Sequence, residues 1–197
     1  MWFLALMFIS MLVIGFPTQA DPLQDAAREG DIGKIEEIIG RGADLNAHDV
    51  SGGPPLIEAA LAGQKAAVEI LLAKGAAIDS RDKGGFTALH AAAYAGHPEI
   101  AELLIVHGAD VNDARNKAKI TPLFAAVEEN HLAVAELLLT HGAEVDAKEA
   151  NGYTPLSRAE FKGHTEMILL LKHHGAKCQP KELISELWYS KCVAASQ

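Results

Sequence analysis

Positive charge is scarce in this chain of 197 residues, which has 17 Lys and Arg residues against 26 Asp and Glu residues. The net charge is −9 at pH 7 and the isoelectric point is about 5.4. Binding to nucleic acid needs a basic stripe that can pair with phosphates. The composition therefore argues against DNA or RNA as a partner.

Sequence signatures of catalysis and of metal binding are also lacking. The chain contains no Gly-x-Ser-x-Gly, no His-Glu-x-x-His and no Gly-x-x-x-x-Gly-Lys segment, each of which would indicate a particular catalytic or phosphate site. Most of its nine histidines repeat at two positions, with His97, His131 and His164 at one and His107, His141 and His174 at the other. Because zinc needs three or four ligands within about 2 Å of one point, such a ladder does not supply a site. We expect no enzymatic activity, no metal site and no cofactor.

Long apolar runs are confined to the start of the chain. Residues 2–16 are almost wholly apolar and uncharged, and Pro17-Thr18-Gln19-Ala20 precedes Asp21. This run is shorter than the roughly 20 residues of a membrane-spanning helix, and small residues at 18 and 20 suit signal peptidase. We predict a signal peptide over residues 1–20 and a periplasmic or secreted protein without membrane contact after cleavage. Because no Lys or Arg lies near Met1, a retained membrane anchor stays the alternative.

Glycine recurs with a fixed spacing through the rest of the chain. One series places Gly or Asn at positions 30, 63, 96, 130 and 163, and a second places Gly at 42, 75, 108, 142 and 175. Both series advance in steps of 33, 33, 34 and 33 residues. Two markers that stay in phase predict stacked supersecondary units, and so an open solenoid.

Residues 82–113 show what one unit contains. Thr87 can cap a helix made of the strong helix formers at 88–95, and Gly96 suits the left-handed turn that ends such a helix. Pro98 fits the first turn of a second helix, whose apolar residues follow helical spacing. A turn-rich link follows, so each unit is predicted to be helix, turn, helix and hairpin, in an all-α fold.

The repeated pattern resembles the ankyrin repeat. The segments that carry the resemblance are Thr87-Ala88-Leu89-His90, Thr121-Pro122-Leu123-Phe124, Thr154-Pro155-Leu156-Ser157, Gly42-Ala43-Asp44-Leu45-Asn46 and Gly108-Ala109-Asp110-Val111-Asn112. The resemblance extends over residues 21–178, with repeats at about 21–48, 49–81, 82–114, 115–148 and 149–178. It implies a stack of repeats that binds another protein without catalysis, and a hydrogen bond between units from the imidazole of His90.

Partners of ankyrin stacks usually bind a concave groove, which is lined by the hairpin tips and the exposed side of each first helix. The residues at these positions that we assign to partner binding are Lys83, Phe86, Tyr94, Arg115, Lys117, Lys119, Lys148, Tyr153, Phe161 and Lys162. Aromatic residues and Arg are enriched at interface centres. We therefore predict a monomer whose basic groove binds an acidic segment of another protein. The alternative is a periplasmic protein that holds and protects a ligand, metal or cofactor.

Residues 179–197 are predicted to form a C-terminal cap helix and tail. After Pro180, apolar residues follow helical spacing at Leu183, Ile184, Leu187 and Trp188. This pattern predicts an amphipathic helix over residues 181–190. A terminal unit of a solenoid exposes an apolar side that needs covering, so we expect this helix to cover the fifth unit.

Cysteine occurs only twice, at Cys178 and Cys192 on either side of the predicted cap helix. An even number of cysteines in an exported protein favours a disulfide, which here would tie the cap to the stack. A straight helix of ten residues holds its ends roughly 15 Å apart, so the linkers would have to fold back to allow the bond. Two free thiols stay the alternative.

Overall fold

The computed structural model describes residues 22–48, 53–179 and 192–193, and within these residues it contains ten α-helices and no strand. They form five helix–turn–helix pairs: α1 (Pro22–Glu29) with α2 (Ile32–Gly40), α3 (Pro55–Leu61) with α4 (Lys65–Ala73), α5 (Ala88–Ala95) with α6 (Pro98–Val106), α7 (Pro122–Glu128) with α8 (Leu132–Thr140), and α9 (Pro155–Lys162) with α10 (Thr165–His173). None of these helices combines the length and the apolar character needed to cross a bilayer. The predicted signal peptide and the predicted cap helix lie outside the described residues.

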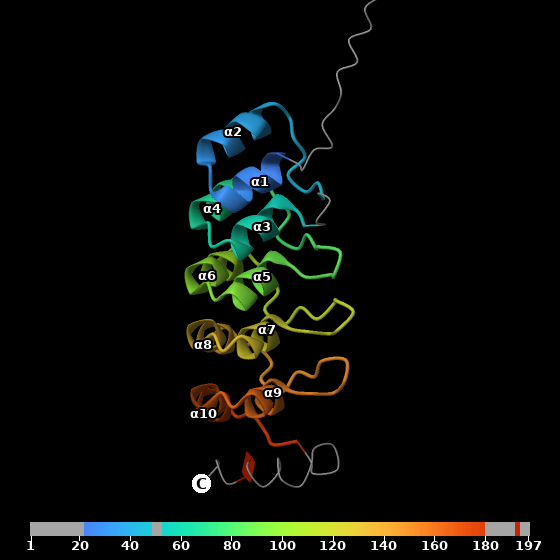
Figure 1. Cartoon of the computed structure of the whole chain (residues 1–197), viewed down its shortest axis with the longest axis vertical. Coiled ribbons are helices and arrows are strands. Elements are labelled where there is room, and N and C mark those ends of the chain that lie inside the picture. The colour runs from blue at the N-terminus through green and yellow to red at the C-terminus, as the bar shows by residue number, and fades with distance from the viewer. Residues whose placement is uncertain (1–21, 49–52, 180–191, 194–197) are drawn as a thin grey trace, which may run out of the picture.

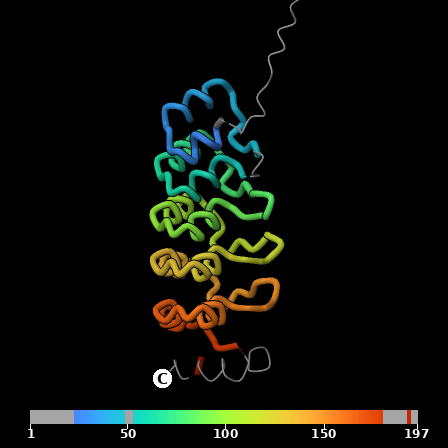
Figure 2. Tube along the Cα trace, in the orientation of Figure 1, coloured from blue at the N-terminus to red at the C-terminus, as the bar shows by residue number. Residues whose placement is uncertain are grey.

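The pairs stack in one direction to form an open solenoid (Figure 1). The first helices of the pairs, α1, α3, α5, α7 and α9, contact one another in an inner row, and the second helices contact one another in an outer row. Loops between successive pairs project to one side of the stack (Figure 2). The all-α solenoid predicted from the glycine period is therefore confirmed.

Local sequence fixes the helix ends. Thr121 and Thr154 are extended at the N-cap positions, and their hydroxyl oxygens accept from the backbone N–H groups of Phe124 and Ser157, at 3.2 and 3.3 Å. A side-chain cap of this kind satisfies an N–H group that has no partner inside the helix. Asn130 takes a left-handed conformation, with φ of 61°, where the other units have glycine. Its side chain tolerates that region better than most, so the shared turn survives the substitution.

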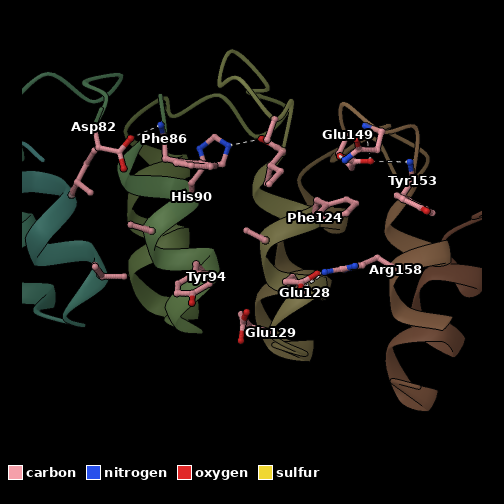
Figure 3. Close-up of a pocket in the computed structure, with 17 residues that line it drawn as sticks. Asp82, Phe86, His90, Tyr94, Phe124, Glu128, Glu129, Glu149, Tyr153 and Arg158 are labelled. Atoms are coloured by element: carbon pink, nitrogen blue, oxygen red, sulfur yellow. Dashed lines mark hydrogen bonds and ion pairs between the residues drawn. The ribbon is translucent and has the colours of Figure 1, made fainter. Parts of the chain in front are cut away.

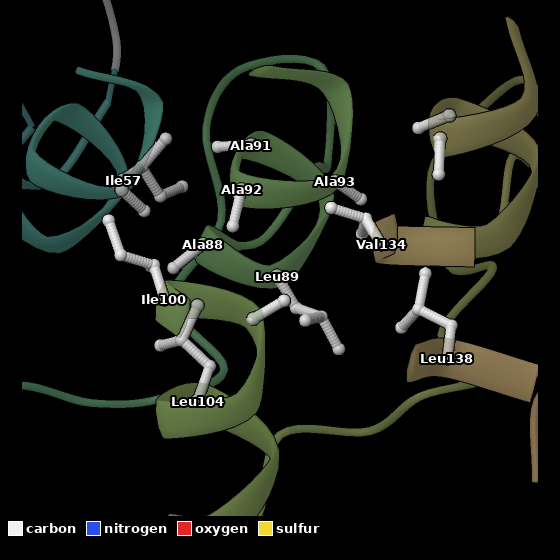
Figure 4. Close-up of a cluster of buried hydrophobic side chains, with 14 of the residues drawn as sticks. Ile57, Ala88, Leu89, Ala91, Ala92, Ala93, Ile100, Leu104, Val134 and Leu138 are labelled. Carbon is white, nitrogen blue, oxygen red and sulfur yellow. The ribbon is translucent and has the colours of Figure 1, made fainter. Parts of the chain in front are cut away.

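Small and large apolar residues divide the packing between them. Some alanines of the inner helices, such as Ala92 and Ala93, are fully buried and let successive units approach closely. The outer helices contribute large side chains that fill the space between units and are also fully buried: Leu71, Leu104, Leu138 and Leu171. Figure 4 shows Leu104 of the third unit and Leu138 of the fourth in this shared core. Burying one such leucine stabilises the fold by roughly 1.5–3 kcal/mol. Because these leucines fill the space between units, this stabilisation depends on the stack and is not available to a single unit.

The C-terminal end of the stack is cross-linked. Cys178 and Cys192 form a disulfide, with their Cα atoms 5.9 Å apart. Cys192 is buried, and its carbonyl oxygen accepts a hydrogen bond from the ammonium group of Lys172 on α10. The chain therefore returns to the last helix pair after residue 179, as the expected bond requires.

Candidate functional site

The shape of the inner face depends on one helix position in each repeat. Successive units have Glu58, Ala91, Ala125 and Arg158 there, at steps of 33, 34 and 33 residues. The second and fifth units thus have long charged side chains, whereas the third and fourth have only a methyl group. The two alanines leave the surface hollow between α5 and α7.

This hollow is a pocket of about 720 Å³ on the side of the stack formed by the first helices and the loops (Figure 3). We call it the concave pocket, and it is lined by Ile57, Leu61, Asp82, Phe86, His90, Ala91, Tyr94, Ala118, Ile120, Phe124, Ala125, Glu128, Glu129, Glu149, Asn151, Tyr153 and Arg158. Its lining comes from α3, α5, α7 and α9 and from the loops between them. The pocket therefore crosses four successive units.

Large apolar side chains border the concave pocket and remain open to solvent. Tyr94 is 53% exposed, Tyr153 48% and Leu61 43%. Between them, Ala91, Ala125 and Phe124 are buried and form an apolar floor. Grouped exposure of large apolar side chains marks a surface that can bind another molecule.

His90 contributes to one wall of the pocket as a structural residue. Its Nδ1 atom accepts from the backbone N–H of Thr87 at 3.3 Å, and its Nε2–H donates to the carbonyl of Ile120 in the next unit at 2.9 Å. Burial lowers the pKa of His90, so the ring is neutral near pH 7 and carries its proton on Nε2. The imidazole thus joins two units, as the ankyrin resemblance implies.

Two charged residues of the pocket, Glu128 and Arg158, form an ion pair that joins two units. Arg158 on α9 donates from Nη2 to Oε1 of Glu128 on α7 at 2.7 Å, and Lys162 Nζ lies 2.8 Å from the same oxygen. The hydrogen bond from Arg158 is the main cause that lowers the pKa of Glu128 to about 2. The guanidinium of Arg158 also lies 5.5 Å from the centre of the Phe161 ring. The positive charges of Arg158 and Lys162 are therefore already used within the protein.

Two further carboxylates of the pocket hold loop backbone. Asp82 accepts from the backbone N–H of Phe86 at 2.8 Å. Glu149 accepts from the backbone N–H groups of Asn151 and Tyr153, at 2.8 and 3.1 Å. These bonds shape the loops that place Phe86 and Tyr153 above the pocket (Figure 3).

Glu129 differs from the other three carboxylates. It follows α7 as the C-cap residue and is exposed. No hydrogen bond or ion pair joins its carboxylate to any residue that the structure describes. Glu129 lies beyond the end of the α7 helix, near the same end of the pocket as Tyr94 (Figure 3). The pocket thus offers one carboxylate to a ligand.

The structure brings together only part of the residue set assigned from the sequence. Three of those residues, Phe86, Tyr94 and Tyr153, line the concave pocket. The remaining seven lie outside its lining: Lys83, Arg115, Lys117, Lys119, Lys148, Phe161 and Lys162. Their assignment to partner binding stays a prediction, and Arg115 also pairs with the buried Asp113, its Nε lying 2.7 Å from Oδ2.

The charge of the pocket lining is opposite in sign to the charge expected for the groove. The lining holds the carboxylates of Asp82, Glu128, Glu129 and Glu149 against the single guanidinium of Arg158, so this pocket is acidic rather than basic. The physical reason is that the lysines of the loops lie outside the lining, whereas the carboxylates come from helix ends and loop bases.

Sequence reasoning also missed Arg158 and Phe124, although the alanines at 91 and 125 could have indicated the hollow.

Four of the six repeated histidines, namely His107, His131, His141 and His164, have backbone partners. His131 Nε2 donates to the Tyr94 carbonyl at 3.0 Å, and His164 Nδ1 donates to the Val127 carbonyl at 3.2 Å, each reaching back by one unit. His141 Nδ1 donates to Leu137 within its own helix turn. In the part of the chain that the structure describes, no three His, Cys, Asp or Glu residues are grouped so that they could hold a metal ion.

Comparison with known families agrees with this architecture. The family model for ankyrin repeats, which contains three copies, matches residues 23–115 and again residues 112–182. Together the two matches include nearly all residues of the five helix pairs. No curated protein matches the chain.

Proposed function

The chain belongs to the ankyrin-repeat family, and we propose that it binds another protein through the concave pocket without catalysing a reaction. Ankyrin repeats generally mediate protein–protein interaction. The observation that carries the proposal is the hollow over Ala91 and Ala125, bordered by the exposed rings of Tyr94 and Tyr153. Aromatic side chains beside a pocket are typical anchors of protein interfaces.

The dimensions of the pocket favour an extended protein segment. Packed helices lie about 8–10 Å apart, so a lining that runs from α3 to α9 extends over roughly 24–30 Å. An extended chain rises about 3.3 Å per residue, so roughly eight residues would span this length. The volume of about 720 Å³ would also admit a small molecule, but such a ligand would contact only part of a lining that comes from four units.

The concave pocket is formed before the partner binds. The residues of its floor lie on helices whose core side chains are buried in the stack. Loop residues on its rim are held by Asp82 and Glu149. Binding therefore requires little ordering of the protein, which lowers the entropic cost of association.

Export of the protein is part of the proposal. The apolar run at residues 2–16 and the small residues at 18 and 20 support a signal peptide. The disulfide between Cys178 and Cys192 supports an oxidising compartment, because disulfides persist in the periplasm and outside cells. We therefore place the binding function in the periplasm or the extracellular space.

Filling the hollow tests the proposed function. The Ala91→Gln/Ala125→Gln double variant places long neutral side chains at a position where Glu58 and Arg158 are tolerated. We expect the partner captured by the purified wild-type chain from a periplasmic extract to be lost with this variant. Ala133→Gln, on the exposed face of α8, is the matched control and should retain it. Equal capture by all three folded proteins would contradict binding at the pocket.

A further inference from the structure

We propose that the partner segment bound in the concave pocket presents a Lys or Arg side chain and a large apolar side chain on the same face, and that this segment is not acidic. This inference rests on the proposed function, because it describes the chemistry of the partner that the pocket binds. It follows from the division of roles among the four carboxylates of the pocket, and from the apolar floor beside Glu129, the pocket carboxylate that has no partner among the described residues.

The carboxylates of the pocket determine the sign of the missing charge. Glu128 is neutralised by Arg158 and Lys162, whereas Asp82 and Glu149 accept from backbone N–H groups. Glu129 makes no such contact with the described residues. A cationic side chain of the partner would complete an ion pair there, and a carboxylate would meet repulsion instead.

Tyr94 gives the same cation a second contact. Its ring is 53% exposed and lines the end of the pocket at which Glu129 lies (Figure 3). Lys and especially Arg side chains bind favourably over aromatic faces. A guanidinium or ammonium group placed between Tyr94 and Glu129 would therefore be attracted by both.

The apolar neighbour of the cation is specified by the floor of the pocket. Ala91 and Ala125 remove side-chain bulk, and Phe124 and Ile120 provide apolar surface next to them. A large aliphatic or aromatic side chain fits this hollow and would bury area that is now open to solvent. Residues next to one another in an extended segment point to opposite faces, so we expect the cation and the apolar residue two positions apart.

An acidic segment does not fit the same surface. The only positive group in the lining, the guanidinium of Arg158, is paired with Glu128. Lys117 and Lys119, which suggested an acidic partner, lie outside the lining. The net charge of −9 also opposes the approach of an acidic partner and speeds that of a basic one at low ionic strength.

A random peptide display library tests the partner chemistry without knowledge of the natural partner. The intact chain is the bait, and the Ala91→Gln/Ala125→Gln variant removes peptides that bind elsewhere. We expect the enriched peptides to share a Lys or Arg two positions from a large apolar residue. For synthetic copies of them, Glu129→Gln should raise Kd about tenfold at low salt, whereas Glu136→Gln on the exposed side of α8 should leave Kd unchanged.

The outcomes separate the inference from the proposed function. Enriched peptides that need the open hollow but are acidic or uncharged would overturn the basic partner and keep the proposed function. The same holds for basic peptides whose affinity is unchanged by Glu129→Gln. Peptides that bind the filled variant as well as the wild type, or no enrichment at all, would overturn both.

Discussion

At the scale of single residues, the inner face of this protein is shaped by what stands at equivalent positions of neighbouring repeats. Ala91 and Ala125 leave the concave pocket open, whereas side chains as long as those of Glu58 and Arg158, which occupy the same repeat position in other units, would fill it. In the same way, Gly96 accommodates a ring from the next unit. A Cβ atom at Gly96 would lie 2.5 Å from Nδ1 of His131, whose Nε2 is bonded to the Tyr94 carbonyl.

Gly96→Ala should therefore destabilise the stack more than Gly163→Ala. Both glycines end an inner helix with a positive φ, of 78° and 76°, so both variants carry the same backbone strain. Only Gly96 is contacted by a ring of the following unit, since no described atom lies within 4 Å of a Cβ at Gly163. We expect an additional loss of roughly 1–3 kcal/mol for Gly96→Ala in urea unfolding. Equal losses in the two variants would contradict the close approach.

The pairing of Glu128 predicts a loss of stability in acid. The hydrogen bond from Arg158 lowers its pKa from 4.5 in the unfolded chain to about 2. The contribution is therefore complete above pH 4.5 and disappears as the pH falls through about 2. Because the Glu128 side chain is 21% exposed, we expect about 1–2 kcal/mol after screening by solvent. Thermal unfolding between pH 6 and pH 2 should show a steeper loss for the wild type than for Glu128→Gln, and parallel curves would contradict the pairing.

At the scale of elements, the helices could be predicted because their signals lie within one repeat. Thr154 and Ser157 form a cap three residues apart, and Asn130 keeps the turn that glycine makes elsewhere. The charge of the pocket could not be predicted in this way. Arg158 reaches Glu128 in the preceding repeat, 30 residues away, so its charge cannot be counted as available from the sequence alone. The hollow likewise exists only because two alanines of different units lie side by side.

The disulfide joins the last helix pair to the segment that follows it. Cys178 and Cys192 are 14 residues apart, and a cross-link of this span restricts the unfolded chain enough to stabilise the fold by about 3 kcal/mol in the chain-entropy model. We expect the Cys178→Ser/Cys192→Ser variant to unfold at lower urea concentration by up to this amount. The oxidised wild type without reductant is the reference. A variant with an unchanged unfolding midpoint would show that the bond does not stabilise the end of the stack.

At the scale of the whole molecule, the compartment decides which partners the pocket can meet. We expect the protein isolated from cells to begin at Asp21, because the small residues at 18 and 20 precede it. N-terminal sequencing or intact-mass measurement of the soluble periplasmic fraction tests this expectation. Recovery of the chain with Met1 in the membrane fraction would establish a retained anchor and contradict cleavage.

The central claim, that the concave pocket is the binding surface, is tested most directly by the affinity of the captured partner for a Tyr94→Ala/Tyr153→Ala variant. Both rings are about half exposed and border the pocket, so their removal should leave the helical content and the unfolding temperature nearly unchanged. Loss of aromatic anchors typically costs about 2 kcal/mol or more, so isothermal titration calorimetry should show Kd raised by roughly 30-fold or more. Val106→Ala, at a residue that is 71% exposed and outside the pocket lining, should bind as the wild type does. An unchanged Kd for the double variant would contradict the account.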